Sequence, residues 1–330
     1  MSDKLVPQVV TVGSMAIDSI RTPVGQDEHC LGGAAVHGSM SASFFSKVGL
    51  VGVVGDDYPA EAVSMLEERG IDLSGVQHAA GKTFFWKGYY EFDMAEAHTE
   101  ETCLNVFADF RPELPEHYRE APFVFLANID PELQLNVLSQ VRSPKLTMAD
   151  TMNFWISSKL DALAEVVKRV DVVFMNDAEI RQFTSALGLS SVTNVVKAAR
   201  QVLDMGPQAV IVKKGSHGAA MFRKDADPNG PLGMSYFVAP AYPLSDYADP
   251  TGAGDSFAGG FVGTLARLNS TSDAAMRQAI IYGSVMASFN VEDFSVNRVR
   301  RLTMDEIHNR YRDFQRIVKF EALEELETVG

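Results

Sequence analysis

A short glycine-rich segment carries the residues best suited to do chemistry. Residues Asp249 to Asp255, with the sequence DPTGAGD, run directly into a predicted helix. Gly252 and Gly254 would let the backbone approach a ligand closely, and the free N–H groups of a first helical turn favour a negatively charged oxygen. Asp255 beside such an anion hole could accept the proton of an attacking hydroxyl group while the N–H groups stabilise a phosphoryl group in transfer. The segment therefore indicates phosphoryl transfer, although an aspartate in this position is also a common helix cap.

The helix that follows this turn is predicted from its apolar residues. They recur at helical spacing, which places Asp255 in the first turn. These residues are Phe257, Phe261, Leu265 and Leu268.

The same segment resembles the D-T-x-G-A-G-D signature of the ribokinase-like (PfkB) sugar and nucleoside kinases, with Pro250 in place of the usual threonine. The resemblance implies that Asp255 is the catalytic base and that Gly252, Ala253 and Gly254 form the anion hole. It also implies ATP as the phosphoryl donor and Mg²⁺ as the cofactor.

A second segment, Leu31 to His37, resembles the Gly-Gly signature at the sugar site of that family, and residues 47–57 resemble its second strand and G-x-D turn. The substrate contacts that follow from the resemblance are Asp18, Gly32, Gly33 and His37. A carboxylate suits paired hydroxyl groups because it accepts two hydrogen bonds, although Asp18 could equally be a turn residue. His37 stands where many sugar kinases carry Asn, and Ala34 where ribokinase-type members often carry Lys, which argues against plain ribose or fructose as the substrate.

The second half of the chain resembles the nucleotide side of the same kinases. Asn176 to Glu179 (NDAE) resembles their N-x-x-E motif, although the pattern alone also fits a capped helix start. Lys213 to Gly218 (KKGSHG) resembles their K-x-G-x-x-G loop, here between two predicted strands, and residues 280–288 resemble the helix beside the adenine. The implied nucleotide contacts are Asn176, Lys213, Gly215, Gly218, Thr251 and Gly283, and Glu179 is the implied Mg²⁺ residue, acting through water.

Short apolar runs separated by helix-like segments set the expected fold. The runs predict strands at residues 8–13, 123–127, 145–149 and 172–175, each buried on both faces, and residues 161–169 predict a helix. Such alternation predicts an α/β fold, with a doubly wound, mostly parallel sheet covered by helices on both faces. Asn128 and Asp130 follow one strand and residues 150–153 the next, at the carboxyl ends where such sheets bind ligands, so both residues are further candidate substrate contacts.

Two stretches break this rhythm, at about 14–30 and 82–108, and their aromatic and β-branched residues predict antiparallel strands outside the main sheet. We expect them to form a small lid inserted into one kinase-like domain spanning residues 1–330. The exposed edges of such a lid would favour a homodimer.

The composition restricts the partners. The 29 Lys and Arg against 43 Asp and Glu give a net charge of −14, which repels nucleic acid and anionic membranes. Two distant cysteines, Cys30 and Cys103, fit free thiols in a reducing compartment, and the start of the chain lacks the pattern of a secretion signal. We therefore expect a cytoplasmic protein with a small-molecule substrate.

The acceptor is the open question at this stage. Polar strand ends favour a sugar, whereas the aromatic run Phe84 to Tyr90 could form a wall for a nucleobase or could simply pack within the lid. Two other classes are a ligand-binding protein of the same fold without turnover, against which an intact Asp255 argues, and a glycosidase, which would need no ATP.

Overall fold

The computed structural model describes residues 5–189, 194–224 and 233–321. The sequence prediction about a secretion signal concerned the start of the chain, and residues 1–4 lie outside the described residues.

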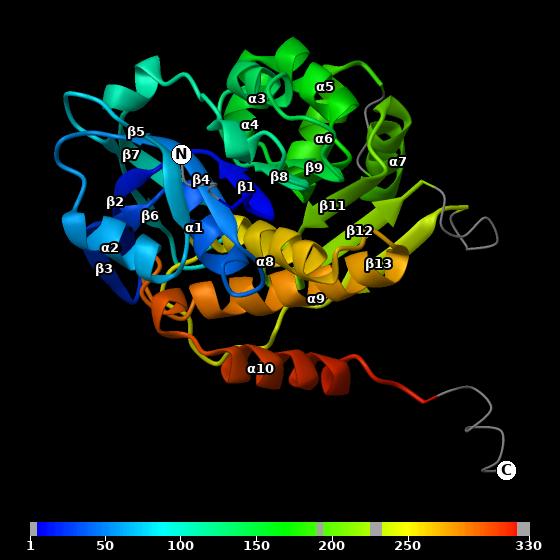
Figure 1. Cartoon of the computed structure of the whole chain (residues 1–330). Helices are drawn as coiled ribbons and strands as arrows, with labels where there is room; N and C mark the ends of the chain where they lie inside the picture. Colours follow the sequence, from blue (N-terminus) through cyan, green and yellow to red (C-terminus); the bar gives the residue numbers. More distant parts are fainter. Residues whose placement is uncertain (1–4, 190–193, 225–232, 322–330) are drawn as a thin grey trace, which may run out of the picture.

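A central sheet of nine strands organises the described part of the chain (Figure 1). In spatial order the strands are β13 (Ser235–Ala239), β12 (Ala219–Arg223), β11 (Ala209–Lys213), β10 (Val172–Asn176), β9 (Leu146–Ala149), β8 (Phe123–Leu126), β1 (Val9–Val12), β4 (Val48–Val54) and β5 (Asp72–His78). The pairs from β11 to β5 are parallel, and β12 and β13 continue the sheet antiparallel. The predicted doubly wound, mostly parallel sheet is confirmed.

Alternate residues of the short strands pack into two separate cores. In β8, Phe123 and Phe125 belong to one core, while Val124 and Leu126 belong to the other. This division follows from the two-residue period of a strand, and it requires the apolar runs that the sequence shows.

Helices cover both faces of the sheet. The first core includes side chains of α1 (Ala34–Ala42), α2 (Ala60–Glu68), α8 (Ala253–Leu268), α9 (Asp273–Asn290) and α10 (Met304–Ile317). The second includes side chains of α3 (Pro131–Leu138), α4 (Asn153–Ser158), α5 (Leu160–Arg169), α6 (Asp177–Ala186) and α7 (Val195–Met205). Figure 1 shows α8 and α9 in yellow and orange beneath the sheet, with α10 outside them. Of the described helices, none has the length and apolar character needed to cross a bilayer.

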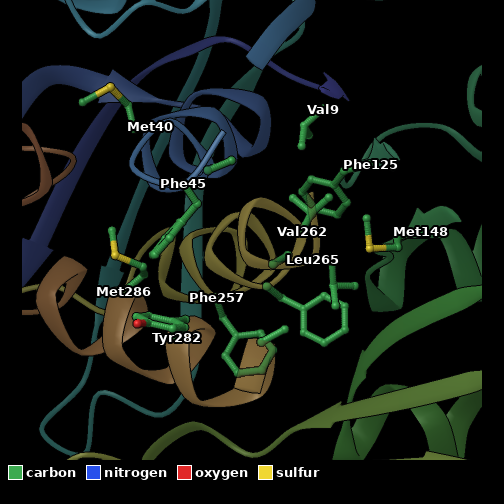
Figure 2. Close-up of a cluster of buried hydrophobic side chains, with 14 of the residues drawn as sticks. Val9, Met40, Phe45, Phe125, Met148, Phe257, Val262, Leu265, Tyr282 and Met286 are labelled. Carbon is green, nitrogen blue, oxygen red and sulfur yellow. The ribbon is translucent and has the colours of Figure 1, made fainter. Parts of the chain in front are cut away.

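Helix α8, which begins at the predicted active-site turn, is buried over most of its length. Every residue from Ser256 to Ala266 is buried, and Phe261 lies 5.5 Å from Phe174 of β10, ring centre to ring centre. Figure 2 shows Val262 and Leu265 on the side of α8 that faces Phe125 of the sheet. The predicted helix is confirmed, and Leu268, its last residue, is 39% exposed.

Close backbone contact fixes α8 between its neighbours. A side-chain carbon at Gly259 would lie 2.1 Å from the carbonyl oxygen of Gly38 in α1, and one at Gly283 of α9 would lie 2.8 Å from the carbonyl oxygen of Phe257. Glycine at 259 therefore lets α1 and α8 touch through their backbones, and the close helix packing at Gly283 leaves no space beside that residue.

A separate four-stranded sheet forms the lid, as predicted, although its central pair is parallel where antiparallel strands were expected. Its order is β3 (Gly25–Gly32), β2 (Ala16–Thr22), β6 (Phe84–Tyr90) and β7 (Ala97–Cys103). Strands β2 and β6 are parallel, and the two outer pairs are antiparallel. Four 3₁₀ segments complete the described secondary structure, at Asn105–Asp109, Glu116–Tyr118, Gly215–His217 and Val299–Arg301.

The contact between α1 and α8 can be tested by Gly259→Ala. The added methyl group would collide with the backbone of α1, so we expect the free energy of unfolding in urea to fall by about 1–3 kcal/mol, although alanine is the better helix former. Ser64→Ala on the exposed side of α2 is the matched control and should change stability by less than about 0.5 kcal/mol. Equal stability of Gly259→Ala and the wild type would contradict the described packing.

Candidate active site

The glycine-rich turn opens α8 as the sequence predicts. Gly252 occupies the N-cap position with a φ of 74°, and a side-chain carbon there would lie 2.3 Å from the ring of His37. Glycine is therefore required twice over, by the left-handed backbone and by the imidazole beneath it. The N–H group of Ala253 donates to the carbonyl oxygen of Pro250 at 3.2 Å, so of the three residues assigned to the anion hole this one already has an acceptor.

Asp255 lies in the first turn of α8 and keeps part of its surface open to solvent. Burial raises the pKa of its carboxyl group to about 7, the negative charge of Asp150 adds to the rise, and the ammonium group of Lys213 opposes it. A carboxylate with a pKa near neutrality binds a proton more strongly than an exposed one does, which is the property required of a general base.

Lys213 is the cation that faces this aspartate. Its Nζ lies 2.5 Å from Oδ2 of Asp150, and it would lie 3.1 Å from a side-chain carbon at Gly254. Burial alone would lower the pKa of Lys213, but the charges of Asp150, Glu179 and Asp255 raise it above its usual value. The ammonium group is therefore permanently charged and lies against the amino end of α8.

Asp18 of β2 is a second carboxyl group with a raised pKa, and it interacts with the charge of Asp255. Burial raises its pKa to about 8, and the negative charges of Asp249 and Asp255 add to the rise. A side-chain carbon at Gly32 would lie 1.9 Å from Oδ2 of Asp18, so the glycine backbone makes room for this carboxyl group. Gly33 begins α1 with a φ of 99°. The structure thus gathers Asp18, Gly32 and Gly33 at the lid side of the site.

Asp249, which the sequence analysis used only as the start of the motif, holds the turn in place. Its buried carboxylate accepts the N–H groups of Thr251 at 2.8 Å and Ser295 at 3.0 Å. Burial raises its pKa, whereas these hydrogen bonds oppose the rise. The bond from Thr251 closes the DPTGAGD turn, and the bond from Ser295 joins the turn to the segment after α9.

His37 lies behind the turn and is 2% exposed. The amide nitrogen of Asn290 donates to the carbonyl oxygen of Thr251 at 2.7 Å, so Oδ1 of Asn290 is the acceptor for Nδ1 of His37 at 2.9 Å. His37 therefore carries its proton on Nδ1, and burial lowers its pKa to about 4, which keeps the ring neutral. Ser256 donates to the same oxygen. Asn290 is the centre of this network, and no motif in the sequence marks it.

Four of the residues assigned to the nucleotide and to Mg²⁺ lie in two other segments of the chain. Asn176 and Glu179 form a reciprocal capping box at the start of α6, and burial raises the pKa of Glu179 to about 7 while Lys213 opposes the rise. Gly215 and Gly218 have φ values of 52° and 87° in the tight connection between β11 and β12. The prediction that two strands flank a tight glycine turn at residues 213–218 is thus confirmed.

Two of the predicted substrate residues make contacts on the α3–α5 side. Asn128 accepts from Nε1 of Trp155 at 3.0 Å. Asp130 caps α3, with Pro131 in the first turn, and pairs with Lys159 at 2.7 Å. An aspartate directly before a proline is a common helix start, so the sequence held a signal for this structural role.

The lid reaches the turn through Tyr90, whose hydroxyl group lies 3.1 Å from Oγ1 of Thr251. A cavity of about 730 Å³ lies elsewhere in the described part of the chain: it is lined by Pro7, Gln8, Phe44 and Lys47, among others, at the amino ends of β1 and β4. The carboxyl groups described above lie instead near the carboxyl ends of the parallel strands, where ligands of such sheets bind.

Comparisons with known proteins agree with this geometry. The family model described as pfkB family carbohydrate kinase matches residues 6–300. A cytidine kinase from Thermococcus kodakarensis is 31% identical over 265 residues, which cover 78% of this chain and 88% of the relative.

Solved structures show the same fold. A nucleoside kinase of Methanocaldococcus jannaschii, described as an archaeal member of the ribokinase family, has a TM-score of 0.72 at 20% identity, with 94% of this chain and 100% of that chain covered. A protein from E. coli described as a ribokinase II, in complex with ATP and Mg²⁺, has a TM-score of 0.71 at 18% identity and covers 93% of this chain and 99% of its own.

The raised pKa values make a prediction about stability. The pKa of Asp255 rises from 3.8 to about 7 and that of Asp18 from 3.8 to about 8, so between about pH 4 and pH 8 the folded protein holds protons that the unfolded chain has released. These two groups therefore reduce stability as the pH rises through that window. Asparagine cannot ionise, so Asp255→Asn and Asp18→Asn should each melt at a higher temperature than the wild type, with a larger gain at pH 8.5 than at pH 5.

Thermal unfolding at the two pH values measures this gain. The control is Asp305→Asn, which changes an exposed aspartate in the first turn of α10 and should show no gain that grows with pH. Equal melting temperatures for the wild type, Asp18→Asn and Asp255→Asn at pH 8.5 would show that burial does not raise the pKa values of the two carboxyl groups.

Proposed function

The chain belongs to the pfkB family of carbohydrate kinases, and from this premise we propose that it transfers the γ-phosphoryl group of ATP to a hydroxyl group of a sugar or nucleoside, with Asp255 as the general base. The observation that carries the proposal is the position of Asp255: a carboxyl group with a pKa of about 7, in the first turn of a helix that opens on a glycine turn.

Proton transfer is the role proposed for Asp255. As a carboxylate it accepts the proton of the acceptor hydroxyl while the oxygen attacks phosphorus, and the bond from phosphorus to the oxygen that bridges to ADP breaks. The raised pKa lets Asp255 hold this proton near neutral pH. The helix N-terminus next to it favours the negative charge of the transferred group.

Charge stabilisation is the role proposed for Lys213. In the structure its ammonium group pairs with Asp150 beside Gly254. A phosphate group at the amino end of α8 would lie within reach of the same ammonium group and could share it with Asp150. Asp150 and Lys213 are the two charged groups that shift the pKa of Asp255, and Lys213 is the cation of the two, so its loss should weaken the binding of a triphosphate.

The acidic residues around Lys213 also suit Mg²⁺. Among the described residues no three His, Cys, Asp or Glu side chains lie together closely enough to hold a metal ion by themselves. Mg²⁺ keeps several waters and binds phosphate oxygens, so one or two carboxylates, here Asp150 and Glu179, are enough to orient its hydration shell. When bound, Mg²⁺ neutralises charge on the phosphate oxygens.

Asp18 is the residue proposed to hold the acceptor. In its protonated form, which a pKa of about 8 favours at neutral pH, the carboxyl group both donates and accepts a hydrogen bond and so matches a pair of neighbouring hydroxyl groups. Sugars and nucleosides both present such a pair. The names of the relatives, cytidine kinase and nucleoside kinase, favour a nucleoside.

The kinase assignment replaces the glycosidase and binding-protein alternatives. The expected cytoplasmic location is compatible with the described cysteines, which are free thiols, and the homodimer through the lid stays a prediction.

Asp255→Asn tests the general base. Removal of a base in direct contact with the acceptor typically lowers turnover about 10²–10⁴-fold, so we expect kcat to fall by that factor while the affinity for ATP changes little. Release of ADP measures kcat, and isothermal titration calorimetry with an ATP analogue measures the affinity. Asp305→Asn, which removes a carboxylate from another helix start, should keep full activity. Activity of Asp255→Asn within threefold of the wild type would refute the assignment.

Lys213→Met tests the charge assigned to the phosphate. We expect the KM for ATP to rise about tenfold or more, because the neutral side chain cannot bind phosphate. Loss of the ammonium group should also raise the pKa of Asp255 further, so the acidic limb of the pH–rate profile should move to higher pH. The adjacent, exposed Lys214 provides the control, since Lys214→Met should change neither quantity. If both variants behave like the wild type, Lys213 does not act on the nucleotide.

A further inference from the structure

The lid sheet has two chemically different faces. In the parallel pair of β2 and β6, Asp18 is aligned with Trp86, so their side chains leave the sheet on the same side. The two-residue period places Gly88 and Tyr90 on this side as well. Asp18 is close enough to Asp249 and Asp255 for their charges to raise its pKa, and Tyr90 touches Thr251. This side, defined by Asp18, Trp86, Gly88 and Tyr90, is the inner face.

The outer face carries charged and polar pairs. Arg21 and Lys87 both pair with Glu100, at 3.1 and 3.5 Å. Tyr89 stacks on His98 with 5.0 Å between ring centres, and the guanidinium group of Arg21 lies 4.8 Å from the centre of the Tyr89 ring. The aromatic residues Trp86 and Tyr89 therefore serve different surfaces, although only three positions separate them.

The indole of Trp86 is held in one position on the inner face. Its Nε1 donates to Oγ1 of Thr99 in β7 at 3.1 Å. Gly88 provides the space for the ring, because a side-chain carbon there would lie 2.3 Å from the six-membered ring of the indole. Trp86 is only half-buried, so part of this fixed aromatic surface is open.

The fixed indole and the carboxyl group assigned to the acceptor come from paired positions of two adjacent strands. Adjacent strands are about 4.8 Å apart, so Asp18 and Trp86 start from neighbouring points of the inner face. A free sugar would use only the polar partner. A nucleoside offers hydroxyl groups for the carboxyl group and, on the same ribose, a flat base for the indole.

We propose that Trp86 is the stacking platform for the base of a nucleoside acceptor, whose ribose hydroxyl groups bind Asp18. The proposal rests on the proposed kinase function and names the acceptor class. Gly88 is part of the platform because a larger residue would displace the indole. Tyr90, through Thr251, holds the same face of the lid against the glycine turn.

Kinetics with matched acceptors test the platform. The panel contains cytidine, uridine, adenosine and inosine, with ribose as the acceptor that lacks a base. Loss of base stacking by substitution with alanine reduces binding about 5- to 150-fold, so Trp86→Ala should lower kcat/KM for the preferred nucleoside by that factor and leave the value for ribose within about threefold. Trp86→Phe, which keeps a smaller ring, should recover part of the loss. The control is Tyr89→Ala, an aromatic residue of the same strand on the outer face.

Fluorescence provides a readout that does not depend on turnover. The chain has two tryptophans, Trp86 and Trp155. Addition of the preferred nucleoside should quench the emission of the wild type and of Trp155→Phe, and should not quench that of Trp86→Phe. Ribose should quench none of the three.

The outcomes separate this proposal from the function on which it rests. A wild type that phosphorylates ribose or another free sugar more efficiently than every nucleoside would overturn the platform and leave the kinase intact, as would equal losses in Trp86→Ala and Tyr89→Ala. Absence of turnover with every acceptor would contradict the proposed function. In that case nucleoside quenching that requires Trp86 would still support the platform, and its absence would overturn it.

Discussion

The burial of several carboxyl groups around a single lysine is the constraint on which the site depends. Asp18, Asp255 and Glu179 all have raised pKa values because burial disfavours their charged forms. Lys213, paired with Asp150, offsets part of the rise for Asp255 and Glu179. Such an arrangement costs stability in the folded protein and is retained where proton transfer or cation binding needs it. Under the proposed function, a local lysine, a helix N-terminus and a divalent cation would oppose the overall field of a chain with a net charge of −14 where the triphosphate binds.

The fold holds these groups together by backbone contacts that only glycine permits. Gly259 allows α8 to touch α1, Gly252 allows the turn to pass over His37, and Gly32 makes room for Asp18. Asn290 then joins α9 to the turn and to His37 through both ends of its amide group. Because α1, α8 and α9 share one core, a shift of any of them would move Asp255 relative to Asp18. The position of Asp255 is thus set by the packing of these helices, whereas the lid brings Asp18 and the aromatic surface.

Local patterns predicted much of this arrangement from the sequence. The apolar runs located β1, β8, β9 and β10 to within one or two residues, because strands buried on both faces must be apolar throughout. The glycine turn located Asp255 for a similarly local reason. Contacts between distant segments left no such trace: Asn290 follows Asp255 by 35 positions without a motif, and the pair of Lys213 with Asp150 spans β10. Asp130 shows that one local pattern can fit two roles: the structure gives it a helix cap, and its assignment to the substrate stays a prediction.

The central claim is that burial raises the pKa of the Asp255 carboxyl group to about 7. The most direct measurement is a pH titration of the aspartate carboxyl carbons by ¹³C NMR, in the wild type and in Asp255→Asn. The account predicts resonances that titrate near pH 7 and pH 8 in the wild type, of which the one near pH 7 is absent from Asp255→Asn. A spectrum in which every aspartate titrates near pH 4, with nothing near neutrality to lose in the variant, would contradict it.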